Sequence, residues 1–154
     1  MPDPYRSEAV WLDRRPGALV VACSDGRFDE ALDEFCSKRL GLAGYDRLFV
    51  QGGIQILRLG SLLPKFEWAG RRLLRFLVDQ HDLKRLVCVS HHGCAWYREL
   101  KWGPEAHLDS EIRQKRDLAA VAGDLRELWS GLKVEAYFAR PEGGRAVFED
   151  VAGP

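Results

Sequence analysis

Cysteine is scarce in this 154-residue chain, and charge of one sign is not in excess. The four cysteines, Cys23, Cys36, Cys88 and Cys94, are too few for a disulfide scaffold, and no Cys-x-x-Cys pair offers dithiol redox chemistry. The 23 basic and 23 acidic residues cancel, so bulk charge does not favour a nucleic-acid partner.

Long apolar runs are also missing. No apolar segment approaches the ~18 residues that a membrane span requires, and no positively charged start leads into an apolar leader. We therefore expect a cytoplasmic protein with reduced thiols, no membrane partner and no nucleic-acid partner. Reduced thiols in such a protein serve as core residues, metal ligands or catalytic groups.

Strand-like and helical patterns alternate along the chain, which is typical of an α/β protein. The patterns predict strands at 18–23, 47–50, 86–90, 134–139 and 146–148, and helices at 28–40, 65–81 and 105–130, with a short helix opening at Ala95. This order predicts a mostly parallel central sheet flanked by helices, with a C-terminal strand pair. We expect residues 1–16 to form an N-terminal arm and residues 17–154 to form a single domain.

Some packing details can also be predicted. Cys36 and Cys88 lie on apolar patterns, so we expect both in the core. The longest predicted helix has a candidate break near Gly123, while residues 54–64 give no clear prediction. The expected inner positions of the helix at 65–81 are Phe66, Ala69, Leu73, Leu74, Phe76 and Leu77.

Three chemically distinctive segments follow the ends of three predicted strands. They are Cys23-Ser24-Asp25-Gly26-Arg27, Gln51-Gly52-Gly53 and His91-His92-Gly93-Cys94. In open parallel sheets, ligands bind outside the carboxyl ends of the strands. We therefore expect these segments to converge on one edge of the sheet and to form a site there.

The ligand types of Cys23, His91 and Cys94 suit a catalytic zinc ion with one open position. Residues alone leave two alternatives, a reduced core cysteine beside a metal-free turn and a cysteine nucleophile. A phosphatase loop is disfavoured, because only three residues separate Cys94 from Arg98. Asp25 and Arg27 could form a bidentate pair, either as a surface ion pair or as an orienting carboxylate held by its arginine.

The pattern Cys23-x-Asp25-x-Arg27 followed by His91-x-x-Cys94 resembles the signature of the β-class carbonic anhydrases, over roughly residues 18–150. The resemblance implies reversible hydration of CO₂ to bicarbonate by zinc-bound hydroxide, in a homodimer or higher homo-oligomer. It implies that Cys23, His91 and Cys94 bind Zn²⁺, that Asp25 accepts a hydrogen bond from the hydroxide, and that Arg27 holds Asp25. In some members the aspartate becomes a fourth zinc ligand and closes the site, which Asp25 could do.

Departures from the family pattern concern the pocket wall more than the ligands. The family commonly has Arg-Asn-Ala-Gly after its second strand, where this chain has Gln51-Gly52-Gly53-Ile54. We expect Gln51, Gly52 and Gly53 to border the substrate pocket. Two other functions stay open: hydrolysis of linear molecules such as COS or CS₂ at the same site, and a zinc protein of this type that has lost catalysis.

Aromatic residues near the second motif have a plainer interpretation. Trp96, Tyr97 and Trp102 follow Cys94 and are expected to pack the adjoining helix rather than to line a pocket. His92 is expected to lie beside the site or in solvent, not to shuttle protons.

Overall fold

The computed structural model describes residues 1–58, 63–101 and 103–151 of the chain. The strands are β1 (Ala18–Cys23), β2 (Asp46–Val50), β3 (Arg85–His91), β4 (Lys133–Glu142) and β5 (Arg145–Asp150). The α-helices are α1 (Asp29–Glu34), α2 (Pro64–Gln80), α3 (Ala95–Glu99) and α4 (Ser110–Leu128). Short 3₁₀ segments are η1 (Gly26–Phe28) and η3 (Gly53–Leu57), and the π-helical η2 (Phe35–Arg39) continues α1.

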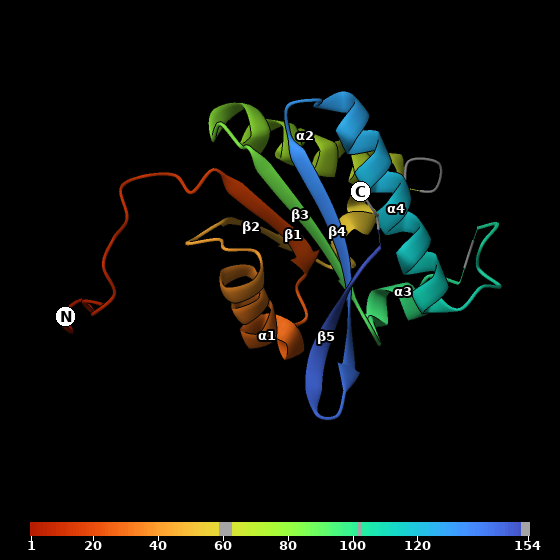
Figure 1. Cartoon of the computed structure of the whole chain (residues 1–154), viewed down its shortest axis with the longest axis horizontal. Coiled ribbons are helices and arrows are strands. Elements are labelled where there is room, and N and C mark those ends of the chain that lie inside the picture. The colour runs from red at the N-terminus through yellow and green to blue at the C-terminus, as the bar shows by residue number, and fades with distance from the viewer. Residues whose placement is uncertain (59–62, 102, 152–154) are drawn as a thin grey trace.

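One sheet runs through the described part of the chain, in the strand order β2-β1-β3-β4-β5. The first four strands are parallel, and β5 returns antiparallel to β4. The predicted α/β class, the parallel sheet and the C-terminal strand pair are therefore confirmed. Because β1, β2 and β3 run in the same direction, their carboxyl ends meet at one edge (Figure 1).

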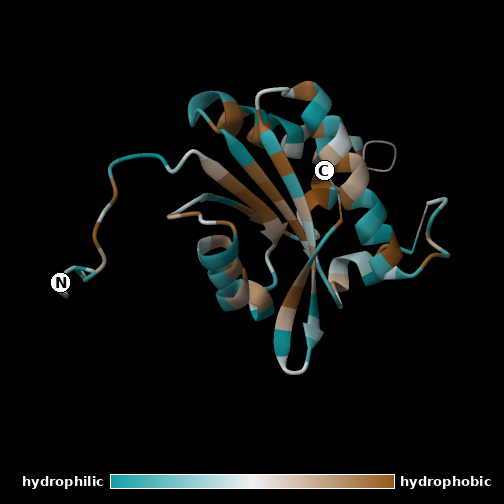
Figure 2. Cartoon of the chain, in the orientation of Figure 1, coloured by the Kyte–Doolittle hydropathy of each residue, from teal (hydrophilic) through white to brown (hydrophobic). Residues whose placement is uncertain are grey.

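Side chains of the central strands alternate between two apolar layers, as the period of a strand requires. In β1, Leu19 and Val21 face the layer that contains residues of α2 and α4, while Val20 and Ala22 face the layer beneath α1. Apolar residues therefore run the whole length of the strand (Figure 2), as expected for a parallel sheet covered on both faces. Cys36 and Cys88 are fully buried in these layers, as predicted.

The inner face of α2 differs in part from the prediction. Leu74 is buried, but Leu73 and Phe76 are 47% and 49% exposed, so these two predicted inner positions are wrong. Gly70 lies on the buried face of α2, where a Cβ would be only 2.6 Å from Cγ1 of Ile56. Helix α2 therefore packs against η3 on its Gly70 side, while Leu73 and Phe76 stay exposed.

The predicted helix at 105–130 is shorter than expected, and it is not broken. Helix α4 begins at Ser110, where Asp109 accepts a hydrogen bond from the backbone N–H of Glu111, and it runs through Gly123 without interruption. Such an N-cap satisfies a backbone donor that the first turn leaves free. Of the unassigned stretch 54–64, residues up to Leu57 belong to the buried turn η3, while 59–62 lie outside the described residues, as does Trp102.

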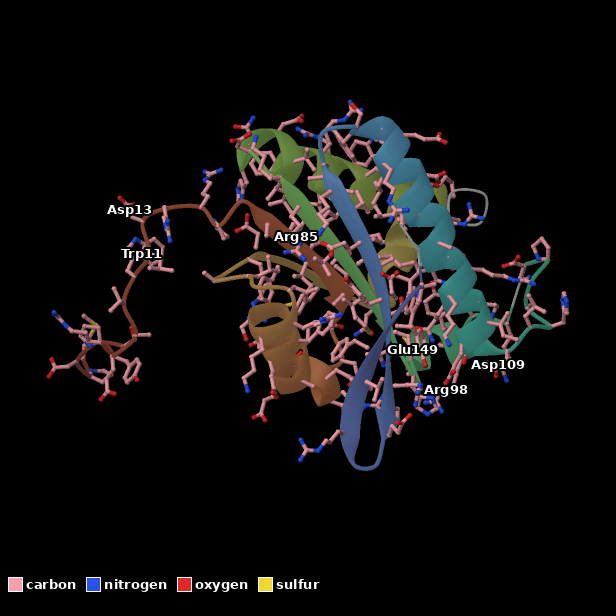
Figure 3. The ribbon with its side chains drawn as sticks, in the orientation of Figure 1. Trp11, Asp13, Arg85, Arg98, Asp109 and Glu149 are labelled. Carbon is pink, nitrogen blue, oxygen red and sulfur yellow. The ribbon has the colours of Figure 1, made fainter. Side chains whose placement is uncertain are left out.

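The first sixteen residues extend away from the body of the molecule as an arm (Figure 1). Trp11 and Asp13 lie on this arm, well clear of the sheet (Figure 3). Trp11 is 86% exposed. Among the described residues, none of the helices has the length and apolar character needed to span a bilayer.

Candidate metal centre

Cys23, His91 and Cys94 come together at the sheet edge as a buried group. Cys23 ends β1, His91 ends β3, and Cys94 precedes the first residue of α3. Their ligand atoms lie within 4.8 Å of one another, and the two sulfur atoms are 4.0 Å apart. Two thiolates on a tetrahedral zinc ion with Zn–S bonds of ~2.3 Å would be about 3.8 Å apart. The spacing therefore fits zinc with little rearrangement.

The imidazole of His91 presents one free nitrogen to the two sulfurs. Its Nδ1–H donates to the carbonyl oxygen of His92 at 2.8 Å, and this bond assigns the proton to Nδ1. The other nitrogen, Nε2, is buried and has no hydrogen-bond partner among the described residues. A buried nitrogen without a partner is costly unless a ligand occupies it. The second ring nitrogen of a metal-binding histidine is usually fixed by such a hydrogen bond.

The groups that surround Cys23 favour its thiolate. The Cys94 thiol is the largest influence, and the His91 ring and the backbone N–H groups of Gly52 and Asp25 add to it, so the pKa of Cys23 is lowered despite burial. The pKa of Cys94 is raised, because Cys23 takes the negative charge first. Burial acts to lower the pKa of His91, but the neighbouring Cys23 sulfur and the hydrogen bond to the carbonyl oxygen of His92 outweigh burial and raise it. A metal ion would displace the remaining protons.

Asp25 and Arg27 form the predicted bidentate pair, at the start of η1. Arg27 Nε lies 2.9 Å from Oδ1 and 3.0 Å from Oδ2 of Asp25, and Nη2 lies 2.5 Å from Oδ2. The Arg27 hydrogen bonds lower the pKa of Asp25 to about 2. The carboxylate also lies 3.9 Å from His91 Nε2, so the pair adjoins the three ligands.

Two hollows adjoin this group. A cavity of about 10 Å³ is bordered by Cys23, Asp25 and His91, with apolar neighbours that include Phe28 and Phe148. A groove of about 780 Å³ between α1 and the β4–β5 hairpin shares Phe28 and Phe148 with it. A cavity needs about 10–15 Å³ to hold one water molecule, so the space beside Asp25 is no larger than a single water requires.

The segment predicted to border a substrate pocket lies against the candidate metal ligands. Gly53, at φ 56°, packs so closely that a Cβ would lie 3.0 Å from the backbone nitrogen of Cys23. Gly52 donates its N–H to Cys23, and the Trp96 ring covers it. Gln51 is exposed. Whether these three residues contact a substrate stays a prediction.

The aromatic residues after Cys94 pack as expected where they are described. Tyr97 is 1% exposed, and its hydroxyl donates to Asp117 at 2.8 Å. Trp96 lies 6.0 Å from the ring of Phe66, measured between ring centroids. His92 lies at the rim and pairs with Glu111 through Nδ1.

Two contacts to the site were missed by sequence reasoning. Gln114 of α4 accepts a hydrogen bond from the backbone of His91, and Arg113 holds the end of α3. One signal was available: Gln114 stands on the apolar stripe of α4, in line with Leu118, Val121 and Leu125. A polar side chain in such a stripe is informative, because glutamine is rarely buried without a partner.

Comparison with known proteins gives a consistent fold. No protein-family model matches the chain, and no curated protein does. Among solved structures, the β-carbonic anhydrase CafA of Aspergillus fumigatus is 17% identical, with a TM-score of 0.52, over 92% of this chain and 78% of that one. A tetrameric β-carbonic anhydrase of Sordaria macrospora is 15% identical, with a TM-score of 0.54, over 88% and 81% of the two chains.

A third solved structure is also similar to this chain. The Coccomyxa β-carbonic anhydrase, solved with acetazolamide, is 13% identical, with a TM-score of 0.53, over 91% of this chain and 75% of that one. The chain has the fold of the β-carbonic anhydrases. The predicted resemblance is thus confirmed at the level of the fold. In this β-carbonic anhydrase fold, Cys23, His91 and Cys94 form a buried group that could hold a metal ion.

Proposed function

We propose that this chain is a zinc lyase of the carbonate dehydratase type, which hydrates CO₂ reversibly to bicarbonate. Cys23, His91 and Cys94 would hold the Zn²⁺ ion. One observation carries the proposal: the Asp25 carboxylate, which accepts hydrogen bonds from Arg27, lies 3.9 Å from Nε2 of His91. A structural zinc site is closed by four protein ligands, so a neighbouring carboxylate has no role there. A catalytic site keeps one coordination position open, and a fixed carboxylate beside that position can accept a hydrogen bond from the group bound there.

The protein residues have distinct parts in this chemistry. Zinc, when bound by two thiolates and an imidazole, supplies an open coordination position and lowers the pKa of a water molecule held there. Asp25 has a pKa of about 2, so at neutral pH it is ionised and can only accept hydrogen bonds. It would therefore orient a hydroxyl group by accepting its proton in a hydrogen bond. Arg27 keeps both carboxylate oxygens in place.

Burial around the ligands supports a small apolar substrate. Phe28 lies 5.0 Å from the His91 ring, measured between ring centroids, and Phe148 borders the same cavity. CO₂ carries no net charge, so apolar surroundings do not impose on it the desolvation cost of an ion. Asp25 as a fourth zinc ligand and a cytoplasmic location stay part of the proposal.

Stopped-flow CO₂ hydration, on protein whose zinc content has been assayed, tests this proposal. We expect about one zinc per chain and hydration above the uncatalysed rate. The Cys94→Ser variant should lose both zinc and activity. Zinc at one per chain without hydration would overturn the proposal, and assays with COS and CS₂ on that sample would then separate a related hydrolase from a silent zinc protein.

A further inference from the structure

Two neighbouring residues of α4 are buried although both are polar. Arg113 is 8% exposed and Gln114 is 1% exposed. Arg113 Nε and Gln114 Nε2 are buried without a hydrogen-bond partner among the described residues. Burying polar groups whose bonds are only partly made is unfavourable. The hydrogen bonds that these two side chains do make therefore need an explanation. Each side chain bonds to a segment that carries one of the candidate metal ligands.

The Gln114 side chain accepts a hydrogen bond from the backbone of His91. Neighbouring residues of a strand direct their N–H groups to opposite sides, and the next N–H, that of His92, donates to Ala139 in β4. The His91 N–H therefore faces β1, but the pairing of β1 with β3 ends at Ala22 and Val89. Gln114 Oε1 accepts this otherwise free N–H at 3.3 Å.

Arg113 hydrogen-bonds to the last residues of α3, the helix that follows Cys94. Its Nη1 donates to the carbonyl oxygen of Leu100 at 2.6 Å, and its Nη2 donates to that of Tyr97. These carbonyls lie at the C-terminal end of α3, where a cation is favoured. Cys94 is the N-cap of the same helix. The guanidinium therefore anchors the short helix that begins directly after Cys94.

We infer that Arg113 and Gln114 act together as a positioning pair, which sets the distance and orientation of His91 and Cys94 for the metal ion. This inference rests on the metal centre of the proposed function, and it concerns ligand geometry instead of the reaction. Successive residues on one rigid helix contact the two ligand segments. A shift of either side chain is therefore transmitted to a ligand, although neither side chain touches the metal.

Zinc affinity, measured by competition with a chromophoric chelator, tests the inference. Gln114→Met keeps the length and volume of the side chain and removes the acceptor. We expect its zinc Kd to rise by about 10- to 100-fold, the usual effect of losing a residue that orients a metal ligand. Gln114→Glu keeps an acceptor oxygen at the same place and should bind zinc nearly as the parent does. Arg113→Met should also raise the Kd.

The Co²⁺-loaded protein gives a second readout that a merely structural role would not change. Its visible d–d bands report ligand geometry, and we expect Gln114→Met to alter their intensity while the metal-free protein keeps its fold by circular dichroism. Lys115→Met is the matched control, because Lys115 lies on the same helix but pairs with Glu149 at 3.0 Å. It should leave the Kd and the bands unchanged.

Two results would overturn the inference. One is a folded Gln114→Met protein with the parental zinc Kd and Co²⁺ spectrum, and the other is a Gln114→Glu protein as impaired as Gln114→Met. If Gln114→Met does not fold, Gln114→Asn withdraws the same amide by one methylene and should give a smaller rise in Kd, while a parental Kd would refute the inference. Normal metal binding without CO₂ hydration would count against the proposed function alone.

Discussion

Arg27 donates a hydrogen bond from Nη2 to the carbonyl oxygen of Gly93, at 3.2 Å, while the same nitrogen lies 2.5 Å from Asp25. Gly93 lies between His91 and Cys94, so Arg27 joins the first sequence motif to the second. The carboxylate is thereby fixed relative to His91 and Cys94, two candidate metal ligands that are far away in sequence. Preorganised groups of this kind cost no rearrangement at the moment of reaction.

Asp25→Ala should keep zinc and lose most of the CO₂ hydration activity. We expect kcat to fall about 100-fold or more, as when one preorganised group of an active site is removed. Arg27 acts through Asp25, so the Asp25→Ala/Arg27→Ala double variant should be no slower than Asp25→Ala. Stopped-flow rates with parallel zinc assays check this. Asp13→Ala, on the exposed arm, is the control, and multiplicative losses in the double variant would show that Arg27 has a separate role.

Metal-free protein should be alkylated selectively at Cys23. Its pKa is lowered, so its thiolate is present at neutral pH, whereas burial raises the pKa of Cys88 to about 12 and that of Cys36 to about 11. Because a lowered pKa means ionisation at lower pH, the iodoacetamide rate at Cys23 should change little between about pH 6 and 9, where a free thiol of pKa ~8.5 would react faster as the pH rises. Peptide mass spectrometry locates the label. Zinc should block it, and equal labelling of Cys36 would contradict the prediction.

Local sequence patterns could predict the strands and bring out three candidate ligands, because both depend on short-range signals. The choice of zinc over a metal-free turn came from the resemblance to the β-carbonic anhydrases. The run Ala18–Cys23 is apolar on both faces, as a central parallel strand must be, and parallel strands bring Cys23 and His91 to one edge. The ion pair of Asp25 with Arg27 needs only two residues of separation. The meeting of Cys23 with His91 and the contact of Asp25 with Arg27 followed from strand direction and spacing.

Contacts between distant segments could not be predicted in the same way. The face that α2 buries depends on Gly70 meeting Ile56, and the helix sequence alone offers apolar residues in several directions, Leu73 and Phe76 among them. The bond from His91 to Gln114 arises because β1 ends before β3 does. Both contacts depend on where helices and strands end or how closely they approach one another. Neither property can be read from the local sequence.

Hydration activity should rise with pH above neutrality. Two thiolates and a neutral imidazole cancel the charge of Zn²⁺, which makes it a weaker Lewis acid than an ion held by three neutral imidazoles, whose bound water has a pKa of ~7. Asp25 has a lowered pKa of about 2, so it is fully ionised throughout the neutral and alkaline range and adds no inflection there. The pH dependence of kcat/KM, followed from mildly acidic to alkaline pH, checks this. A profile that is flat and maximal below neutrality would contradict it.

Exposed apolar residues on α2 are consistent with the homo-oligomer that the resemblance to the β-carbonic anhydrases implies. Leu73 and Phe76 are 47% and 49% exposed and lie three positions apart, so they are neighbours on the helix surface. Exposed apolar residues that lie together can mark contact sites. We expect light scattering to give a dimer or larger species, and Leu73→Glu/Phe76→Glu to shift it toward monomer. Leu128→Glu, at a 50% exposed position on α4, serves as the comparison. A parent protein that is monomeric at all concentrations would refute this.

Gly52→Ala should destabilise the metal-free protein and weaken zinc binding. Gly52 has φ 71°, which costs an alanine about 1–2 kcal/mol, and its new Cβ would lie 2.3 Å from Cδ1 of Trp96. Displacing either group would also disturb the N–H that Gly52 donates to Cys23. Urea unfolding and the zinc Kd measure the two effects.

A double-mutant cycle separates backbone strain from the contact with Trp96. Gly143→Ala is the strain-only control, because Gly143 has φ 56° and a Cβ added there would meet no atom within 4 Å. Gly52→Ala should therefore cost more than Gly143→Ala, and in a Trp96→Ala background the excess should disappear, with a coupling free energy of about 0.5–3 kcal/mol. Equal losses for the two glycines would mean that the indole moves aside freely, and Trp96 would then have no part in holding the Gly52 N–H against the Cys23 thiolate.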